Sequence, residues 1–111
     1  MKRLVVFVLA AILPMSSFAA YQCSVKVIQV LIYSNGTVNV MHSGRNNYTV
    51  ICSLDSNSGG VSPTTCAMWT AMLQSIKKKD GNATFYFNGD GTCDTMNLYG
   101  DAPIPVYIGD A

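Results

Sequence analysis

The apolar positions of this chain follow three patterns, and each predicts a different kind of element. Residues 4–14 are almost wholly apolar, residues 25–33 are dense in β-branched and aromatic side chains, and residues 66–76 carry apolar side chains at helical spacing. These patterns are typical of an export leader, a strand and a helix, respectively. We therefore expect a leader followed by a small domain that contains both strands and a helix.

The first apolar run has the layout of a secretory signal peptide. Two basic residues precede it, and Ser17 and Ala19 follow it at a spacing that suits signal peptidase. Cleavage after Ala19 or after Ala20 leaves 92 or 91 of the 111 residues, which is the length of one domain. We expect residues 1–20 to be the signal peptide and residues 21–111 to form a single exported domain.

Five runs in the exported part are typical of strands, because each is short and rich in β-branched or aromatic residues. They cover residues 25–33, 37–41, 48–54, 83–87 and 104–108. Asn35 and Gly36 separate the first two runs, and such a pair is a strong hairpin signal. Pro103 and Pro105 predict that the last strand lies at an edge of the sheet.

One helix is expected between the third and fourth strands, and it has a signal at each end. Ser62 supplies an N-cap, Pro63 suits the first turn, and Gly81 can take the left-handed conformation after the last turn. The lysines at 77–79 complement the negative end of the helix dipole. The apolar face consists of Cys66, Trp69, Met72, Leu73 and Ile76. The element order is therefore β-β-β-α-β-β, with Trp69 in the core rather than exposed as a stacking platform for a sugar.

The composition of the exported part limits its partners. Five lysine and arginine residues stand against six aspartates, which gives a net charge of −1, and the chain has no glutamate. A near-neutral domain lacks the basic surface that nucleic acid requires. The longest apolar run after the leader, residues 30–33, is far below the roughly 20 residues of a membrane span. A surface rich in Asn, Ser, Thr, Gly and Tyr suits an uncharged polar ligand, and it suits equally a protein that only has to stay soluble.

Four cysteines in a short exported chain predict two disulfides, because the folded protein meets an oxidising compartment. Of the three pairings, we favour Cys52 with Cys66 and Cys23 with Cys93. The first of these bonds closes a 15-residue loop, worth roughly 3 kcal/mol on the chain-entropy model. A zinc site is disfavoured, since no Cys-x-x-Cys spacing occurs.

The chain offers little for catalysis or for a cofactor. His42 is the only histidine, no Gly-x-Ser-x-Gly motif accompanies it, and no glutamate is present to act as an acid. Residues 88–94 resemble a calcium loop in composition, but Cys93 stands where the invariant glycine belongs and no glutamate closes the loop. We expect a binding protein without enzymatic activity, metal or cofactor. Six tyrosines offer rings to stack on a ligand and hydroxyls to bond it, namely Tyr21, Tyr33, Tyr48, Tyr86, Tyr99 and Tyr107.

Two segments resemble parts of a known family. Residues 24–31 resemble the first strand of the binding (B) subunits of AB5 toxins of the pertussis and subtilase-cytotoxin type, in which a serine precedes a Val-Ile pair and a later leucine. Residues 69–76, followed by Gly81 and the strand around Phe85, resemble the helix, glycine and next strand of those subunits. The chain also looks like short uncharacterised exported bacterial proteins that have a Cys-Trp helix and a closing Pro-x-Tyr-Ile stretch.

The resemblance implies a β-rich (α+β) domain with a five-stranded OB-fold-like barrel, stapled here by disulfides, which is a scaffold used for oligosaccharide binding. In the toxin subunits a serine near the first strand contacts sialic acid. Ser24 alone corresponds to it by position, with Tyr21 and Lys26 as its nearest partners. The implied ligand is a glycan or host surface receptor, and the implied protein partners are further copies of the chain and a toxin A subunit.

The predicted function is therefore glycan recognition on a cell surface by a secreted or periplasmic binding module. The alternative is a periplasmic or secreted protein-interaction module, such as an inhibitor or an accessory subunit.

Overall fold

Five strands and one helix make up the part of the chain that the computed structural model describes, residues 19–111. They are β1 (Ala20–Ile32), β2 (Thr37–His42), β3 (Asn47–Ser53), α1 (Pro63–Lys78), β4 (Asn82–Asn88) and β5 (Tyr107–Asp110). The predicted element order is confirmed. The signal peptide predicted for residues 1–20 lies outside the described residues as far as position 18.

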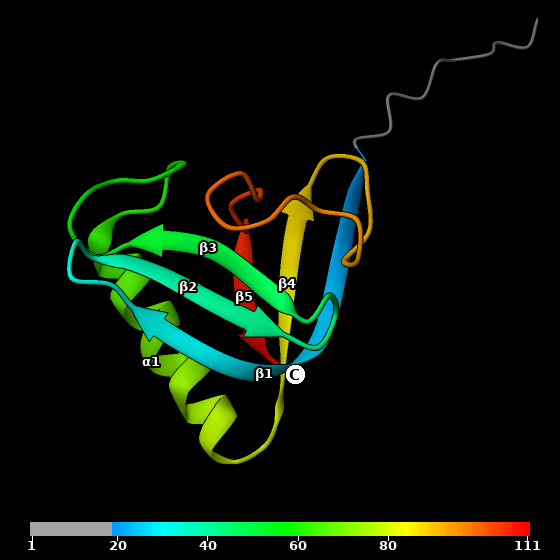
Figure 1. Ribbon diagram of the computed structural model, residues 1–111, viewed down its shortest axis with the longest axis horizontal. Coiled ribbons are helices and arrows are strands. Elements are labelled where there is room, and N and C mark those ends of the chain that lie inside the picture. Colours follow the sequence, from blue (N-terminus) through cyan, green and yellow to red (C-terminus); the bar gives the residue numbers. More distant parts are fainter. Residues whose placement is uncertain (1–18) are drawn as a thin grey trace, which may run out of the picture.

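The strands form one antiparallel sheet in the order β3-β2-β1-β4-β5 (Figure 1). β1 is long and pairs with two other strands. Residues 20–26 pair with β4, and residues 27–32 pair with β2. The register shifts between Val27 and Gln29, and Figure 1 shows β1 turning from β4 toward β2. An irregularity of this kind bends a strand. The sheet therefore has two arms that meet at β1, the β1–β4–β5 arm and the β1–β2–β3 arm.

The sheet is open, because β3 and β5 form no strand ladder with each other in the described part of the chain. The residue that pairs with the free edge of β3 is Tyr99, which lies in the loop before β5. Its N–H donates to the Tyr48 carbonyl at 2.9 Å, and its carbonyl accepts from the Val50 N–H at 3.1 Å. The structure is thus a small β-rich domain with an open five-stranded sheet and one helix, and its strands alone do not close the barrel expected from the sequence.

The helix begins as predicted and ends one residue earlier than predicted. The Ser62 hydroxyl accepts from the Thr65 N–H at 3.2 Å, and a proline fills the first helical position. At the other end, the left-handed residue is Asp80, with a φ of 57°, and not Gly81. Gly81 donates to the Ile76 carbonyl at 2.9 Å, which closes the last turn. Aspartate tolerates the left-handed region better than most residues, so the chain reverses before the glycine is reached.

One face of α1 joins the strands in the core. Its buried residues are Cys66, Trp69, Thr70, Leu73 and Ile76. Trp69 is 7% exposed, so its predicted place in the core is confirmed, whereas Met72 is only half-buried. Thr70 joins the buried face because its hydroxyl donates to the Cys66 carbonyl at 2.7 Å. The sheet contributes fully buried side chains that include Val38, Val40, Ile51, Phe85 and Phe87.

Two disulfides staple the domain, and they are the pairs favoured from the sequence. Cys52–Cys66 joins the end of β3 to the first turn of α1, and Cys23–Cys93 joins β1 to the loop between β4 and β5. Their Cα atoms lie 5.6 Å and 5.7 Å apart, respectively. No helix within residues 19–111 is long and apolar enough to cross a membrane.

The last strand lies at an edge of the sheet as predicted, but it begins later than predicted. Pairing with β4 starts at Tyr107, whereas the sequence predicts a strand over residues 104–108. Pro103 and Pro105 have no N–H to donate to a neighbouring strand, and Pro105 is buried instead. The loop between β4 and β5 therefore spans residues 89–106.

Candidate functional site

Alternation along β1 decides which of the predicted site residues come together. Gln22, Ser24 and Lys26 are exposed, and they alternate with the buried residues Cys23 and Val25. Two of the three predicted residues, Ser24 and Lys26, therefore share the outer face of the β1–β4–β5 arm.

Tyr21 lies on the opposite side of β1, so its predicted place beside Ser24 is wrong. Its ring stacks on Phe87 with a centroid distance of 5.1 Å, and its hydroxyl donates to the Met96 Sδ at 3.8 Å. Three positions separate Tyr21 from Ser24, and an odd separation puts two strand residues on opposite faces. Burial raises the pKa of Tyr21, an effect that the nearby Arg45 opposes. Tyr21 thus packs against the core and not beside a ligand on the outer face.

A pair of stacked tyrosines occupies the outer face where Tyr21 was expected. In the strand registers, Tyr86 of β4 lies opposite both Gln22 of β1 and Tyr107 of β5, so the three side chains share one face. The two rings lie 4.9 Å apart at an angle of 8°, and the Gln22 Nε2 donates to the Tyr107 hydroxyl at 2.9 Å. Thr84 lies opposite Ser24 in the same manner. The outer face is therefore a polar platform with an aromatic end.

Lys26 lies on this platform at the end away from the tyrosines. Its Nζ is 3.0 Å from the Asp80 Oδ1, and both side chains are well exposed, at 52% and 90%. Its backbone N–H donates to the Ser43 hydroxyl at 2.9 Å. An exposed pair of this kind contributes at most about 1 kcal/mol. The ammonium group can therefore exchange Asp80 for an anionic group of a ligand at little cost.

The space over the platform is open. A Cβ built on Gly109, which pairs with Thr84, would meet no atom within 4 Å. A shallow hollow adjoins Tyr86, and within the expected exported domain its lining includes Tyr86, Asn88, Gly89 and Asp90. The arrangement suits a ligand that lies flat on the tyrosines and reaches the polar side chains by hydrogen bonds.

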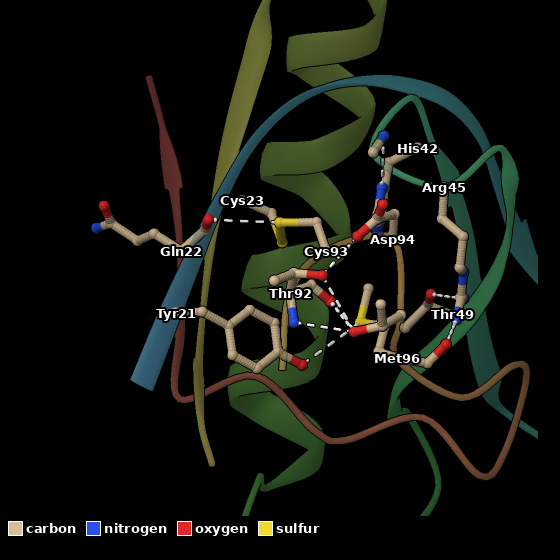
Figure 2. The surroundings of a disulfide bond; sticks show 12 residues. Tyr21, Gln22, Cys23, His42, Arg45, Thr49, Thr92, Cys93, Asp94 and Met96 are labelled. Atoms are coloured by element: carbon tan, nitrogen blue, oxygen red, sulfur yellow. Dashed lines mark hydrogen bonds between the residues drawn. A yellow bond between two sulfur atoms is a disulfide. The ribbon is translucent and has the colours of Figure 1, made fainter. Parts of the chain in front are cut away.

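The inner side of β1 is built around the Cys23–Cys93 disulfide (Figure 2). The Arg45 guanidinium lies beside Thr49 at the other side of the same view, and burial lowers the pKa of Arg45. It donates to four oxygens, the carbonyls of Met96, Asn97 and Tyr48 and the hydroxyl of Thr49. These contacts fasten the 89–106 loop to β3 and to the turn that precedes it.

His42 is buried in the core and lies apart from the outer face. It is 1% exposed, its ring packs on Phe85 with a centroid distance of 5.3 Å, and its Nδ1 accepts from the Gly44 N–H at 3.1 Å. Burial lowers its pKa to about 4, and the charge of Arg45 acts in the same direction. Within residues 19–111, no three His, Cys, Asp or Glu side chains are grouped so that they could hold a metal ion.

Sequence reasoning missed two residues of the platform, Gln22 and Thr84, and placed Tyr86 and Tyr107 only within a set of six tyrosines. Alternation around the buried Cys23 is a signal that could have found Gln22. The pairing of Tyr86 with Tyr107 depends on the register between β4 and β5, which no local pattern encodes.

Comparisons of the chain with protein-family models, with curated proteins and with solved structures find no match. Functional inference therefore depends on the geometry of the platform.

Proposed function

We propose that residues 21–111 are an exported, non-enzymatic module that binds a glycan on a cell surface through the platform of the β1–β4–β5 arm, in the manner of a toxin B subunit. The observation that carries the proposal is that Ser24, Lys26 and the Tyr86–Tyr107 pair share one exposed face. A serine hydroxyl both donates and accepts hydrogen bonds, and a tyrosine ring can cover the apolar face of a sugar. Sialic acid offers hydroxyls, a carboxylate and an apolar ring face, which complement these three features.

The scaffold that we propose is an OB-fold-like barrel. The strand order, the bent β1 and the position of α1 between β3 and β4 favour it. The hydrogen bonds between Tyr99 and β3 lie where the open edges of the sheet would approach each other. OB scaffolds bind oligosaccharides, but a fold does not fix a function, so the proposal depends on the platform.

The proposal includes export and assembly. Two disulfides favour an oxidising location, either secreted or periplasmic. A single exposed sugar site is weak, so useful affinity requires several copies that act together. A homo-oligomer of this module meets that requirement. A toxin A subunit would be the enzymatic partner of such an oligomer.

A glycan array probed with the oxidised domain tests the proposal. We expect wild-type protein to bind sialylated glycans, and we expect Ser24→Ala to reduce affinity by roughly tenfold or more, the equivalent of one lost hydrogen bond to a charged ligand. Tyr107→Ala should reduce it as well, because it removes the stacking ring and the acceptor for Gln22. The melting temperature of Ser24→Ala should stay near that of wild type, since the side chain is exposed.

Ser75→Ala is the matched control, because Ser75 is an exposed serine on α1, away from the platform. It should bind like wild type. Undiminished binding by Ser24→Ala would refute the platform as the site. A strictly monomeric protein that binds no glycan would refute the function and favour a protein-interaction module.

A further inference from the structure

The second half of β1 has a free edge. Residues 27–32 pair with β2 on one side, and within residues 19–111 no strand pairs with them on the other side, since β4 pairs only with residues 20–26. The Tyr33 N–H donates to the Thr37 carbonyl at 2.8 Å. Because hydrogen-bonded pairs alternate along an antiparallel ladder, the N–H and C=O groups of Val30 and Ile32 point away from β2, toward the free edge.

The sequence of this edge does not protect it from pairing with another strand. Residues 27–33 contain no charged side chain and no proline, the residues that proteins commonly place on an exposed edge to prevent such pairing. Ile28 and Ile32 are 40% and 49% exposed. Ile32 lies opposite the fully buried Val38, so it belongs to the core face of the sheet although the core does not cover it. The edge therefore offers a partner strand both backbone groups and apolar side chains.

A hollow lies between this edge and the last turns of α1, and its lining is basic. Figure 1 shows α1 beside this half of β1, and the residues that line the hollow are Gln29, Val30, Gln74, Lys77 and Lys78. Lys77 and Lys78 are exposed, and within residues 19–111 neither forms an ion pair. The Nζ of the neighbouring Lys79, in contrast, lies 2.6 Å from the Asp110 Oδ2. Two positive charges at the hollow are therefore left for the acidic groups of a partner.

From these observations we propose that the hollow docks an extended acidic segment of another protein, which adds a strand to the free edge of β1 and places acidic side chains against Lys77 and Lys78. In complexes of this kind, the backbone hydrogen bonds give affinity and alternate side chains give specificity. Because successive side chains of a strand point to opposite faces, the acidic residues of the partner must stand at alternate positions. A second copy of residues 27–33 would leave both lysines unpaired, since that segment has no acidic residue.

Fluorescence anisotropy with two labelled octapeptides and the oxidised domain tests the proposal. One peptide alternates valine with aspartate, and the other alternates valine with lysine. We expect the acidic peptide to bind and the basic peptide not to bind. The affinity of the acidic peptide should fall as salt is added, because Lys77 and Lys78 are exposed to solvent. In ¹⁵N spectra, the acidic peptide should shift the backbone amides of Val30 and Ile32.

Variants separate the two parts of the docking surface. Lys77→Ala/Lys78→Ala should weaken binding of the acidic peptide about fivefold or more, because it removes two exposed ion pairs. Lys79→Ala is the matched control, since Lys79 is also exposed but is paired with Asp110, and it should bind like wild type. Ile32→Pro removes an N–H of the free edge without removing a hydrogen bond to β2, so it should weaken binding about tenfold. Ile32→Asp, which repels the acidic peptide, serves the same purpose if the proline variant does not fold.

Failure of the acidic peptide to bind overturns the proposal, and so does equal binding of the two peptides. If Lys79→Ala weakens binding as much as the double variant does, the peptide follows the general charge of the helix end and the hollow is not its site. Self-association that Ile32→Pro abolishes, without binding of the acidic peptide, would make a second copy the occupant and the proposal wrong. Ser24→Ala should bind the acidic peptide like wild type, so this test does not depend on the platform.

Discussion

Acidification should destabilise the domain through His42, and the surroundings of this residue set the magnitude. The buried ring accepts from the Gly44 N–H through Nδ1, so a proton on Nδ1 would place two donors against each other. It would also add a positive charge near Arg45. Burial is the larger cause, and together these effects lower the pKa of His42 from 6.5 to about 4 in the folded state.

The sign of the effect follows from linkage. Because the pKa is lower in the folded protein, the unfolded chain binds the proton first as the pH falls. The contribution of neutral His42 to stability is complete above pH 6.5 and is lost between pH 6.5 and pH 4. At about 1.36 kcal/mol for each pKa unit, the whole contribution is about 3 kcal/mol, of which roughly 2.5 kcal/mol is lost between about pH 7.5 and pH 4.5. That is a large share of the roughly 5–15 kcal/mol by which domains are stable.

Urea unfolding at the two pH values, for wild type and for His42→Asn, measures this loss. Asparagine cannot titrate, but its side-chain oxygen can still accept from the Gly44 N–H. The aspartates titrate in both proteins, so the difference between the two losses isolates His42. We expect wild type to lose roughly 2.5 kcal/mol more than the variant. Equal losses, or a His42 pKa near 6.5 in the NMR titration of the folded protein, would refute the reasoning.

Three further variants test the packing and the staples. Trp69→Ala should cost roughly 3–5 kcal/mol in urea unfolding, because Trp69 is 7% exposed, and a melting curve like that of wild type would show that it is not a core residue. The double variant Cys52→Ala/Cys66→Ala should lose about 3 kcal/mol, the entropy of the opened loop, and an unchanged unfolding midpoint would argue against that bond. Arg45→Lys cannot reach the four oxygens that the guanidinium binds, so amides of the 89–106 loop should exchange faster while those of β1 and β4 stay protected. Uniform protection in that variant would show that the loop is held by other contacts.

Nearby side chains made several elements predictable from the sequence. The strand patterns locate β2, β3 and β4 to within one residue at each end. The Asn-Gly signal is correct because Gly36 takes a φ of 88°, and a Cβ at this position would lie 2.7 Å from the Asp55 Cγ. The N-terminus of α1 is correct because Ser62 caps it directly. In each of these cases the structure is determined either by a contact between residues close in the sequence or by a repeating pattern of apolar residues.

The sequence-based predictions of strand bounds and site residues fail where contacts between residues far apart in the chain determine the structure. β1 begins at Ala20, five positions before its predicted start, because its first residues pair with β4 far along the chain. β5 begins late because Pro105 takes a buried place that a local pattern does not reveal. At the candidate site, Ser24 and Lys26 lie on one face as a two-residue period requires, whereas Tyr21 is near Ser24 only in sequence and lies on the other face. The two tyrosines that replace it come from β4 and β5, and only the folded sheet brings them beside β1.

The loop between β4 and β5, residues 89–106, is held at several points and begins beside the proposed binding face. Three sets of interactions hold residues 89–106 in place. They are the disulfide to Cys23, the hydrogen bonds from the guanidinium of Arg45 and the backbone hydrogen bonds of Tyr99 with β3. A loop of this length without its own strands or helices is uncommon in a compact domain and is usually functional. Its first residues line the hollow beside the Tyr86 ring, and Tyr99 forms backbone hydrogen bonds with β3. The hydrogen bonds from Arg45 to this loop therefore explain why an arginine is partly buried in a domain with few charged residues. Its charge serves to fix the loop that begins beside the platform, and the exposed hydroxyls, amide and rings of the platform are left to bind a ligand.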